Sequence, residues 1–173
     1  DCQRQPPTFE RVLAPLRYET PVDDLISRFK YHDGFSEGRA LAGLLADAIH
    51  HSGREALPGL LLPVPMHPAG LRGRGFNQAT ELARVLSSRL GIAYSTRHLS
   101  RVRQAAHQRG LKRGQRQRNL RGAFACQTAL PEHVALVDDV MTTGATVAEI
   151  SRVLRRSGAR RIEVWAVART PND

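Results

Sequence analysis

Hydrophobic side chains recur at two different spacings along this chain, and each spacing predicts a different kind of element. Apolar residues three to four positions apart, typical of a helix with one buried face, occur in 21–31, 36–50, 77–90 and 144–156. Short continuous apolar runs, typical of strands covered on both faces, occur at 60–64, 134–138 and 162–168. A further short strand is expected at Ile92–Tyr94, after the helix that Gly91 ends.

The first two helices have predicted core faces. In the helix at 21–31, the face consists of Leu25, Ile26 and Phe29. In the helix at 36–50, it consists of Leu41, Leu44, Leu45, Ala48 and Ile49.

The order of these elements is strand, helix, strand, twice over, preceded by a helical segment. This order predicts an α/β fold with a mostly parallel, doubly wound sheet. Residues 1–20 are rich in proline and are expected to be irregular. No internal repeat and no linker interrupts the sequence, which predicts a single domain over residues 1–173.

The chain carries a formal net charge of +10, which indicates an anionic partner such as nucleic acid, a phosphorylated metabolite or an acidic surface. Arginine supplies 24 of the 26 basic residues, the other two being Lys30 and Lys112. An arginine-rich composition also follows from genomic base composition. The placement of the charges therefore carries more weight than their sum.

No apolar run approaches the roughly 18 residues that a membrane-spanning helix needs, and no signal peptide is recognisable. Cys2 and Cys126 are too few for a disulfide framework or a complete metal site. The chain is therefore expected to be cytoplasmic. It begins with Asp, so its N-terminus is expected to have been trimmed.

Two adjacent carboxylates, Asp138 and Asp139, stand at the end of a predicted strand, in the stretch LVDDVMTTGAT. In open parallel sheets, ligands bind outside the carboxyl ends of the strands. The next helix begins a few residues later, and the unpaired N–H groups of its first turn favour an anion. Hydroxyl groups and small residues in between add donors and let the backbone approach a ligand. A phosphate is therefore expected on Thr142, Thr143, Gly144, Ala145 and Thr146.

The two carboxylates repel a phosphate, so they are expected to bind another part of the ligand. Carboxylates accept hydrogen bonds from adjacent sugar hydroxyls, and a sugar 5-phosphate fits this spacing. A divalent metal could share the hydroxyl side. The alternative interpretation is a strand end with two solvated acids, followed by Thr143 as an ordinary N-cap.

This stretch closely resembles the phosphoribosyl pyrophosphate (PRPP) motif of type I phosphoribosyltransferases. The resemblance implies that the acidic pair contacts the ribose of PRPP and that the turn binds its 5-phosphate. The implied site consists of Asp138, Asp139, Met141, Thr142, Thr143, Gly144, Ala145 and Thr146. That family usually requires Mg²⁺, held largely by PRPP oxygens and water, so Mg²⁺ is the expected cofactor.

A second polar segment, PVPMHPAGLRGRGFNQA at 63–79, follows the first predicted strand and also lies at the binding edge. Prolines stiffen its loop, and two arginines lead into a helix, an arrangement suited to a diphosphate. The residues expected to bind the diphosphate are Pro65, Met66, His67, Arg72 and Arg74. In the alternative interpretation, Phe76 anchors the core, Asn77 caps the helix and the arginines are solvated.

The same segment resembles the PVPLH and RGFNQ signature of the ComF/GntX-like competence proteins, a branch of the phosphoribosyltransferase superfamily. Residues 6–34 resemble the N-terminal region of that branch, including its Lys-Tyr pair, here Lys30 and Tyr31. Residues 101–124 resemble another of its stretches, with matches at Gln108, Leu111, Arg116, Asn119, Ala123 and Phe124. The resemblance therefore spans nearly the whole chain.

Members of this branch usually carry a four-cysteine zinc finger ahead of a Pro-Pro-x-Phe segment, here residues 6–9. Only Cys2 occupies the position of one of those cysteines, and a single thiolate cannot form a tetrahedral site. The finger is therefore expected to be absent or truncated before Cys2, with no ordered zinc. Cys126 matches no ligand pattern and is expected to be a buried structural thiol.

From Leu82 to Pro131 the chain has eleven Lys and Arg residues and no Asp or Glu. In type I phosphoribosyltransferases a flexible loop in this place closes over the site and excludes water, so residues 97–121 are expected to form such a loop. Its cations would either neutralise the departing pyrophosphate, contact nucleic-acid phosphates, or stay solvated. The loop residues considered for these roles are Arg103, Gln108, Arg109, Lys112, Arg113 and Arg116. The stretch from 95 to 123 contains no aromatic residue, which argues against base stacking by this loop.

Two functions follow from the residues and the resemblance. The first is an Mg²⁺-dependent phosphoribosyltransferase in which an unknown acceptor displaces pyrophosphate from C1 of PRPP, with Asp139 and His67 as candidate catalytic bases. The alternative is a non-catalytic PRPP-sensing or DNA-handling competence protein in natural transformation. Its expected partners are single-stranded DNA and helicase or recombination proteins.

The acceptor is expected to be selected by an N-terminal hood region, residues 1–35, that packs over the site. Four aromatic residues in this region could form the wall of the acceptor site. They are Phe9, Tyr18, Phe29 and Tyr31, and ordinary packing is the alternative role for each.

Overall fold

The structure, a computed structural model, describes residues 8–31, 34–53, 55–103 and 120–171. Its helices are α1 (Val22–Tyr31), α2 (Phe35–His50), α3 (Pro68–Arg74), α4 (Gln78–Leu90) and α6 (Ala145–Arg156). Its strands are β1 (Arg11–Leu13), β2 (Leu16–Arg17), β3 (Leu60–Pro63), β4 (Leu99–Arg101), β5 (Phe124–Cys126), β6 (His133–Met141) and β7 (Arg161–Arg169).

The central sheet has the order β1-β7-β6-β3, and β2 extends the pairing of β1 along the same side of β7. Every strand pair in this sheet is parallel. Strands β4 and β5 form a separate antiparallel pair. The mostly parallel α/β fold predicted from the sequence is therefore confirmed.

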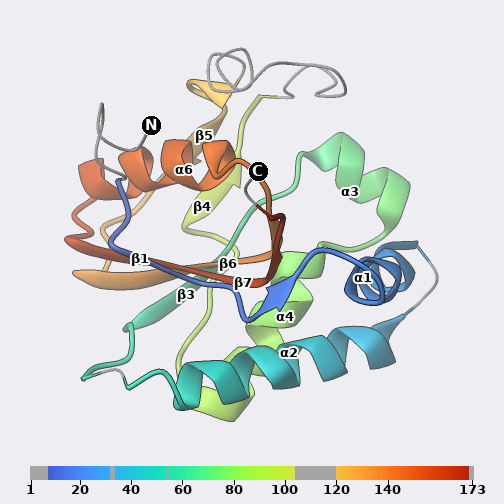
Figure 1. The fold of residues 1–173 in the computed structure, drawn as a ribbon. Helices are drawn as coiled ribbons and strands as arrows, with labels where there is room; N and C mark the ends of the chain where they lie inside the picture. Colours follow the sequence, from blue (N-terminus) through green and yellow to red (C-terminus); the bar gives the residue numbers. More distant parts are fainter. Residues whose placement is uncertain (1–7, 32–33, 54, 104–119, 172–173) are drawn as a thin grey trace.

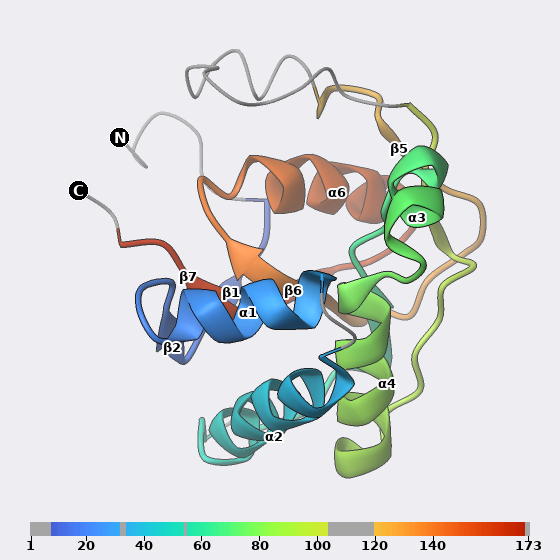
Figure 2. The ribbon, with the colours of Figure 1, turned by 90° about the vertical axis from the view of Figure 1, so that its right-hand side faces the viewer.

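Helices cover both faces of the sheet (Figures 1 and 2). Helices α1, α2 and α4 pack on one face, where Val137 and Trp165 meet Leu41 and Leu82 in a buried cluster. Helix α6 and the β4–β5 pair lie on the opposite face. Because side chains alternate along a strand, β6 and β7 supply apolar residues to both faces, as their continuous apolar runs predict.

The predicted helices are confirmed to within a residue or two at each end, but two of their predicted core residues are wrong. Leu25 of α1 and Leu44 of α2 are exposed. In α2 the buried face runs slightly to one side of the predicted stripe, because the sheet and α4 both contact it. That face consists of Gly38, Leu41, Ala42, Gly43, Leu45, Ala46 and Ile49.

The N-terminal segment is not irregular as predicted, because two short strands within it join the sheet. Leu13 of β1 pairs with Trp165, and Leu16 of β2 pairs with Ala168. Ala14 and Pro15 separate the two strands. Residues 11–13 and 16–17 of the predicted hood region therefore belong to the sheet, and among the described residues of that region it is α1 that reaches the site described below.

Two other predictions, one of a strand and one of a loop, need correction. Ile92–Tyr94 forms only an isolated parallel bridge, in which Leu61 pairs with Tyr94. Residues 97–121 were expected to form a loop, but their described part contains β4, which pairs with β5. No helix within the described part of the chain has the length and apolar character that a membrane crossing requires.

Candidate functional site

The two polar segments predicted from the sequence meet at one edge of the sheet. Strands β3 and β6 are parallel neighbours, and Pro63 at the end of β3 pairs with Val137. One residue further, the Val64 N–H donates a hydrogen bond to the Val137 carbonyl at 2.9 Å. The loop after β3 and the acidic residues after Val137 therefore lie side by side, where ligands of parallel sheets bind.

Asp138 and Asp139 lie inside β6, not after its end. The strand continues to Met141, and its pairing with β7 includes Asp138 opposite Ala166 and Val140 opposite Ala168. On the other side, β3 has already ended at Pro63. The acidic pair therefore stands on a stretch of β6 that continues past its neighbour.

The Asp138 carboxyl is in an environment that disfavours its charge. Burial raises its pKa well above the usual value, and the adjacent Asp139 carboxylate raises this pKa further. The backbone N–H of Asp139 donates to Asp138 Oδ1 at 2.9 Å, and the charge of Lys30 opposes the rise. The two acids of the pair therefore differ in their surroundings.

Asp139 forms an ion pair with Lys30 of α1, whose Nζ lies 2.5 Å from Asp139 Oδ2. The side chains are 21% and 14% exposed, so both are largely withdrawn from water. Lys30 was noted in the sequence only as part of a Lys-Tyr pair and was not predicted to lie in the site. The feature of the sequence that could have indicated a site role for Lys30 is its position just before Tyr31, in the last turn of a predicted helix.

The turn between β6 and α6 leaves the start of the helix open. Gly144 is the N-cap of α6, with φ of 73°, and no side chain among the described residues caps the first turn. Thr143 is therefore not the N-cap of the alternative interpretation. Thr142 and Thr143 are exposed, Thr146 is half-buried, and the side chains of Met141 and Ala145 belong to the core.

Gly144 is required at this position for two reasons. Its positive φ is costly for any residue with a Cβ atom. A Cβ placed there would also lie 3.1 Å from Met141 Cε. The geometry of the predicted phosphate turn therefore depends on this glycine.

The loop after β3 leads into a helix that the sequence did not predict. Helix α3 begins at Pro68, and His67 caps it by accepting the Ala69 N–H at Nδ1, 3.2 Å away. Arg72 and Arg74 therefore lie in the last turn of α3, not in a loop before a helix N-terminus. Arg72 is exposed, and Arg74 is half-buried. The proline at the first helical position and the glycine at the end were the signals for this helix.

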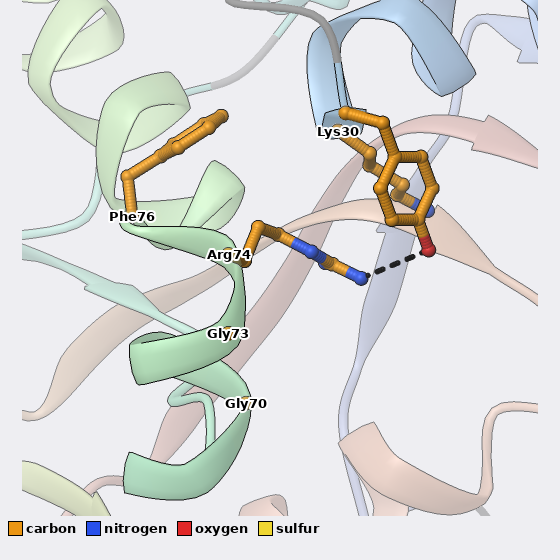
Figure 3. Close-up of a pocket in the computed structure, with 6 residues that line it drawn as sticks. Lys30, Gly70, Gly73, Arg74 and Phe76 are labelled. Carbon is orange, nitrogen blue, oxygen red and sulfur yellow. Dashed lines mark hydrogen bonds between the residues drawn. The ribbon is translucent and has the colours of Figure 1, made fainter.

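Arg74 connects α3 to α1. Its Nη2 donates to Tyr31 Oη at 3.2 Å, and its Cζ lies 5.0 Å from the centre of the Tyr31 ring. Its Nη1 donates to Gln78 Oε1 at 2.9 Å. Figure 3 shows Arg74 reaching from α3 toward the side of the pocket where Lys30 lies, and its dashed line marks the hydrogen bond to Tyr31 Oη.

The alternative interpretation of Phe76 and Asn77 fits the structure. Asn77 Oδ1 accepts the Ala79 N–H at the start of α4, and its Nδ2 donates to the Val64 carbonyl at 3.0 Å. The ring of Phe76 packs against Phe29 and Phe35. Asn77 therefore holds the loop after β3 in place while it caps α4.

Pro65 and Met66 line a pocket of about 480 Å³ between α3, the start of α4 and β4. A second pocket lies beside Lys30. Phe76 contributes to both pockets, and their other lining residues differ. Of the predicted diphosphate-binding residues, Pro65 and Met66 thus line one hollow and Arg74 lines the other, whereas His67 and Arg72 line neither of these two.

Most of the predicted loop residues lie outside the described residues: Gln108, Arg109, Lys112, Arg113 and Arg116. Arg103 is described, and its Nη2 donates to the Arg121 carbonyl at 2.8 Å. Cys2 also lies outside. Cys126 is half-buried at the end of β5, so it is not the fully buried thiol that was expected.

Of the four predicted wall residues, Tyr31 borders the pocket beside Lys30. Phe29 is buried in the core between α1 and its neighbours. Tyr18 and Phe9 pack against the two core clusters, on opposite faces of the sheet. Packing is therefore the role of these three.

The donors at this edge fit a hard divalent cation better than zinc. Among the described residues, no group of three or more His, Cys, Asp or Glu side chains could hold a metal ion. The paired carboxylates of β6 offer oxygen ligands of the kind that Mg²⁺ prefers, and Mg²⁺ usually completes its shell with water and substrate oxygens.

Two curated proteins are similar to this chain over nearly all of its length. Competence protein F of Haemophilus influenzae is 38% identical over 176 residues, covering 98% of this chain and 77% of its own. DNA utilization protein YhgH of Escherichia coli (strain K12) is 35% identical over 173 residues, covering 98% of this chain and 76% of its own. No family model matches the sequence.

Among solved structures, the fold resembles that of glutamine PRPP amidotransferase from B. subtilis, complexed with ADP and GMP. The TM-score is 0.51 at 17% sequence identity, over 81% of this chain and 30% of that chain. At this identity, the similarity concerns the fold.

Proposed function

The chain belongs to the competence protein F family, and from that premise we propose that it binds PRPP at the carboxyl edge of the sheet and transfers its phosphoribosyl group. One observation carries the proposal. A carboxylate pair on β6 is followed, six residues later, by a helix whose first turn no side chain caps. The first feature suits sugar hydroxyls, and the second suits a phosphate.

In the proposed complex the 5-phosphate lies on the turn at 142–146. The N–H groups at the start of α6 and the exposed hydroxyls of Thr142 and Thr143 donate to it. The ribose hydroxyls donate to Asp138 and Asp139. Binding of a hydroxyl to Asp139 would compete with Lys30, which occupies Oδ2 of that carboxylate.

The pyrophosphate would lie toward the loop after β3. Mg²⁺, when bound, would neutralise part of the pyrophosphate charge and help the group to leave. Asp138 and Asp139 are the residues of this chain that would hold the ion, together with PRPP oxygens and water.

In the transfer, an acceptor atom forms a bond to C1 as the bond from C1 to the pyrophosphate oxygen breaks. The pyrophosphate leaves with that electron pair, and the acceptor releases its proton to water. Positive charge develops on the sugar, where the carboxylates stabilise it. The predicted bases are engaged elsewhere, since Asp139 pairs with Lys30 and His67 caps α3.

A DNA-handling role is the second candidate. Two observations favour it: the similar proteins include one named for DNA utilization, and this chain carries a net charge of +10. A basic surface binds nucleic-acid phosphates in a salt-dependent manner. The two functions are compatible, because a PRPP-binding edge would leave the remaining basic surface free.

The test is calorimetric titration of the protein with PRPP, with and without Mg²⁺. We expect micromolar, Mg²⁺-dependent binding, and at least about 100-fold weaker binding for the double variant Asp138→Asn, Asp139→Asn, which loses two charge-assisted contacts. The matched control is Asp23→Asn, Asp24→Asn, an adjacent acid pair in the first turn of α1. Absence of binding at millimolar PRPP would refute the proposal.

Transfer and DNA binding need separate measurements. Pyrophosphate release in the presence of PRPP and candidate acceptors reports turnover. Binding of a single-stranded oligonucleotide at low and high salt reports the second function. DNA binding that is salt-sensitive and unchanged in the Asp138→Asn, Asp139→Asn variant would place it outside the PRPP site.

A further inference from the structure

A pocket of about 270 Å³ lies next to the acidic pair, between α1 and the C-terminal part of α3. It is lined by Lys30, Tyr31, Gly70, Gly73, Arg74 and Phe76 (Figure 3). Lys30 joins the pocket to the proposed ribose site, because the same side chain forms the ion pair with Asp139. A molecule in the pocket would therefore lie close to a sugar bound on β6.

The charge of the pocket selects for an anion. Lys30 and Arg74 are the ionised side chains among its lining residues, and both are cations. Asp139 balances one of these charges, whereas Arg74 donates its hydrogen bonds to the neutral side chains of Tyr31 and Gln78. Within the described part of the chain, one positive charge is therefore uncompensated at the wall formed by α3, in a half-buried position where it interacts strongly.

The shape of the pocket selects for a flat group. Two aromatic side chains, Tyr31 and Phe76, belong to its wall. On α3 the wall consists of Gly70, Gly73 and Arg74. The side chain of Met66 lies beside Gly70, 3.1 Å from where a Cβ atom would be, so a ring can approach the helix backbone at Gly73. A Cβ atom added at Gly73 would meet nothing within 4 Å, so the space beside this residue is open.

We propose that this pocket receives the acceptor of the transfer, and that the acceptor is a small planar ring bearing a carboxylate. The carboxylate would bind Arg74, with the ring beside Tyr31 and Gly73. This inference rests on the proposed function, since it assigns the substrate class of the same site. It adds what the fold and the family leave open, which is the chemistry of the acceptor.

The experiment compares small ligands that differ in one property each. Benzoate is planar and anionic, benzamide is planar and neutral, and cyclohexanecarboxylate is anionic and not planar. Each is titrated into the full chain by calorimetry, with and without PRPP and Mg²⁺. We expect benzoate to bind about tenfold or more tightly than either analogue, because only benzoate satisfies both the charge and the shape.

Three variants locate the binding. Arg74→Met should remove the preference for benzoate over benzamide, and Gly73→Leu should block both by filling the open space. Arg156→Met, at an exposed arginine in the last turn of α6, changes the net charge equally and should leave the preference intact. Unfolding curves of the variants verify that they fold. Should Gly73→Leu fail to fold, the Arg74→Met result decides.

The outcomes separate this inference from the proposed function. PRPP binding together with equal affinity for benzoate and benzamide would overturn the acceptor class and leave the PRPP site standing. Benzoate binding that is insensitive to both pocket variants would also overturn it. Displacement of benzoate by pyrophosphate alone would assign the pocket to the leaving group, and so would overturn its role as acceptor site. Selective benzoate binding in a chain that fails to bind PRPP would support the pocket and refute the transfer.

Discussion

Lys30 and Asp139 form a largely buried ion pair that joins α1 to the carboxyl end of β6, with 2.5 Å between Nζ and Oδ2. Lys30 belongs to α1, which with α2 and α4 covers one face of the sheet (Figure 2). It compensates one charge of the acidic pair in the absence of ligand. The helix that carries Lys30 therefore contributes directly to the electrostatics of the site.

The first prediction concerns this pair. Lys30→Met and Asp139→Asn should each lower the free energy of unfolding by about 1–3 kcal/mol, because each leaves a charged partner uncompensated in a poorly hydrated place. The double variant should lose less than the sum of the two. Denaturant unfolding, followed by the fluorescence of Trp165, the single tryptophan, measures all three.

The exposed pair Arg17 and Glu19, with 3.8 Å between its charged atoms, is the control for that cycle. Its two side chains are well hydrated, so neutralising them should show no measurable coupling. Additive losses for Lys30 and Asp139 would contradict the ion pair as a stabilising contact.

The second prediction concerns the pH dependence of stability. The pKa of Asp138 is raised in the folded protein, so the folded state holds its proton more strongly than the unfolded state does. Stability from this group is therefore fully present below the unfolded value, near 3.8, and is lost as the pH rises through the raised pKa. Asp138→Asn should accordingly be more stable than the wild type at neutral pH, while it binds PRPP less well.

Chemical unfolding at several pH values, from about 3 to 8, measures the difference in the free energy of unfolding between the Asp138→Asn variant and the wild type. The advantage of the Asp138→Asn variant should vanish at the acidic end, where the wild-type carboxyl is protonated in both states. Asp47→Asn, at an exposed acid of α2, removes the same charge from the surface and serves as the reference. An Asp138→Asn variant that is less stable than the wild type at neutral pH would contradict the raised pKa.

The third prediction uses two glycines with the same backbone conformation. Gly144 has φ of 73° and Gly91 has φ of 68°, so an alanine at either position should cost about 1–2 kcal/mol of stability. The Cβ atom at Gly144 would additionally crowd Met141, whereas at Gly91 it would meet nothing within 4 Å. We therefore expect Gly144→Ala to lose more stability than Gly91→Ala, and to be the only one of the two that weakens PRPP binding.

Unfolding curves and PRPP titrations of both variants test this expectation. Equal losses of affinity would mean that the turn before α6 has no particular role in binding. Equal losses of stability would mean that Met141 moves aside at no cost.

The fourth prediction concerns a buried acid at the opposite end of the sheet. Glu163 accepts the Trp165 Nε1–H at 2.9 Å and lies 3.2 Å from His133 Nε2, with only 5% of the residue exposed. Glu163→Gln leaves one acceptor oxygen where there were two and replaces two carboxylate contacts by weaker amide contacts, and should cost about 1–3 kcal/mol. Glu132→Gln, at an exposed acid paired with Arg160, should change little.

The free energy of unfolding of both variants is measured from the change in Trp165 fluorescence with denaturant. PRPP affinity should be unchanged in each. A loss of affinity in Glu163→Gln would mean that this end of the sheet is coupled to the binding edge.

The parts of the fold that depend on long apolar patterns could be predicted from the sequence. The apolar runs of β6 and β7 and the periodic faces of α4 and α6 appear where they were expected. Short elements could not be predicted, because their stability comes from their partners. Strands β1 and β2 have two or three residues each and exist only through pairing with β7.

At the site, the residues close together in sequence were easier to predict than those brought together by folding. The acidic pair and the turn before α6 form one continuous motif. Tyr31 was predicted as a possible wall residue, but Lys30 was not predicted in the site. It reaches the site from α1, more than a hundred residues away from Asp139, and nothing in a single sequence gives that distance. Arg74 was predicted, but its place in α3 and its contact with Tyr31 were not.

The pairing of β1 and β2 with β7 also bears on the solubility of the chain. Strand β7 has nine residues, seven of them buried, and would be a long apolar template for aggregation if its outer side were bare. Two short strands cover it instead, and Pro15 between them lacks the N–H that another chain would need for pairing. Removing residues 8–17 would therefore do more than shorten the protein, since it would expose β7 to self-association.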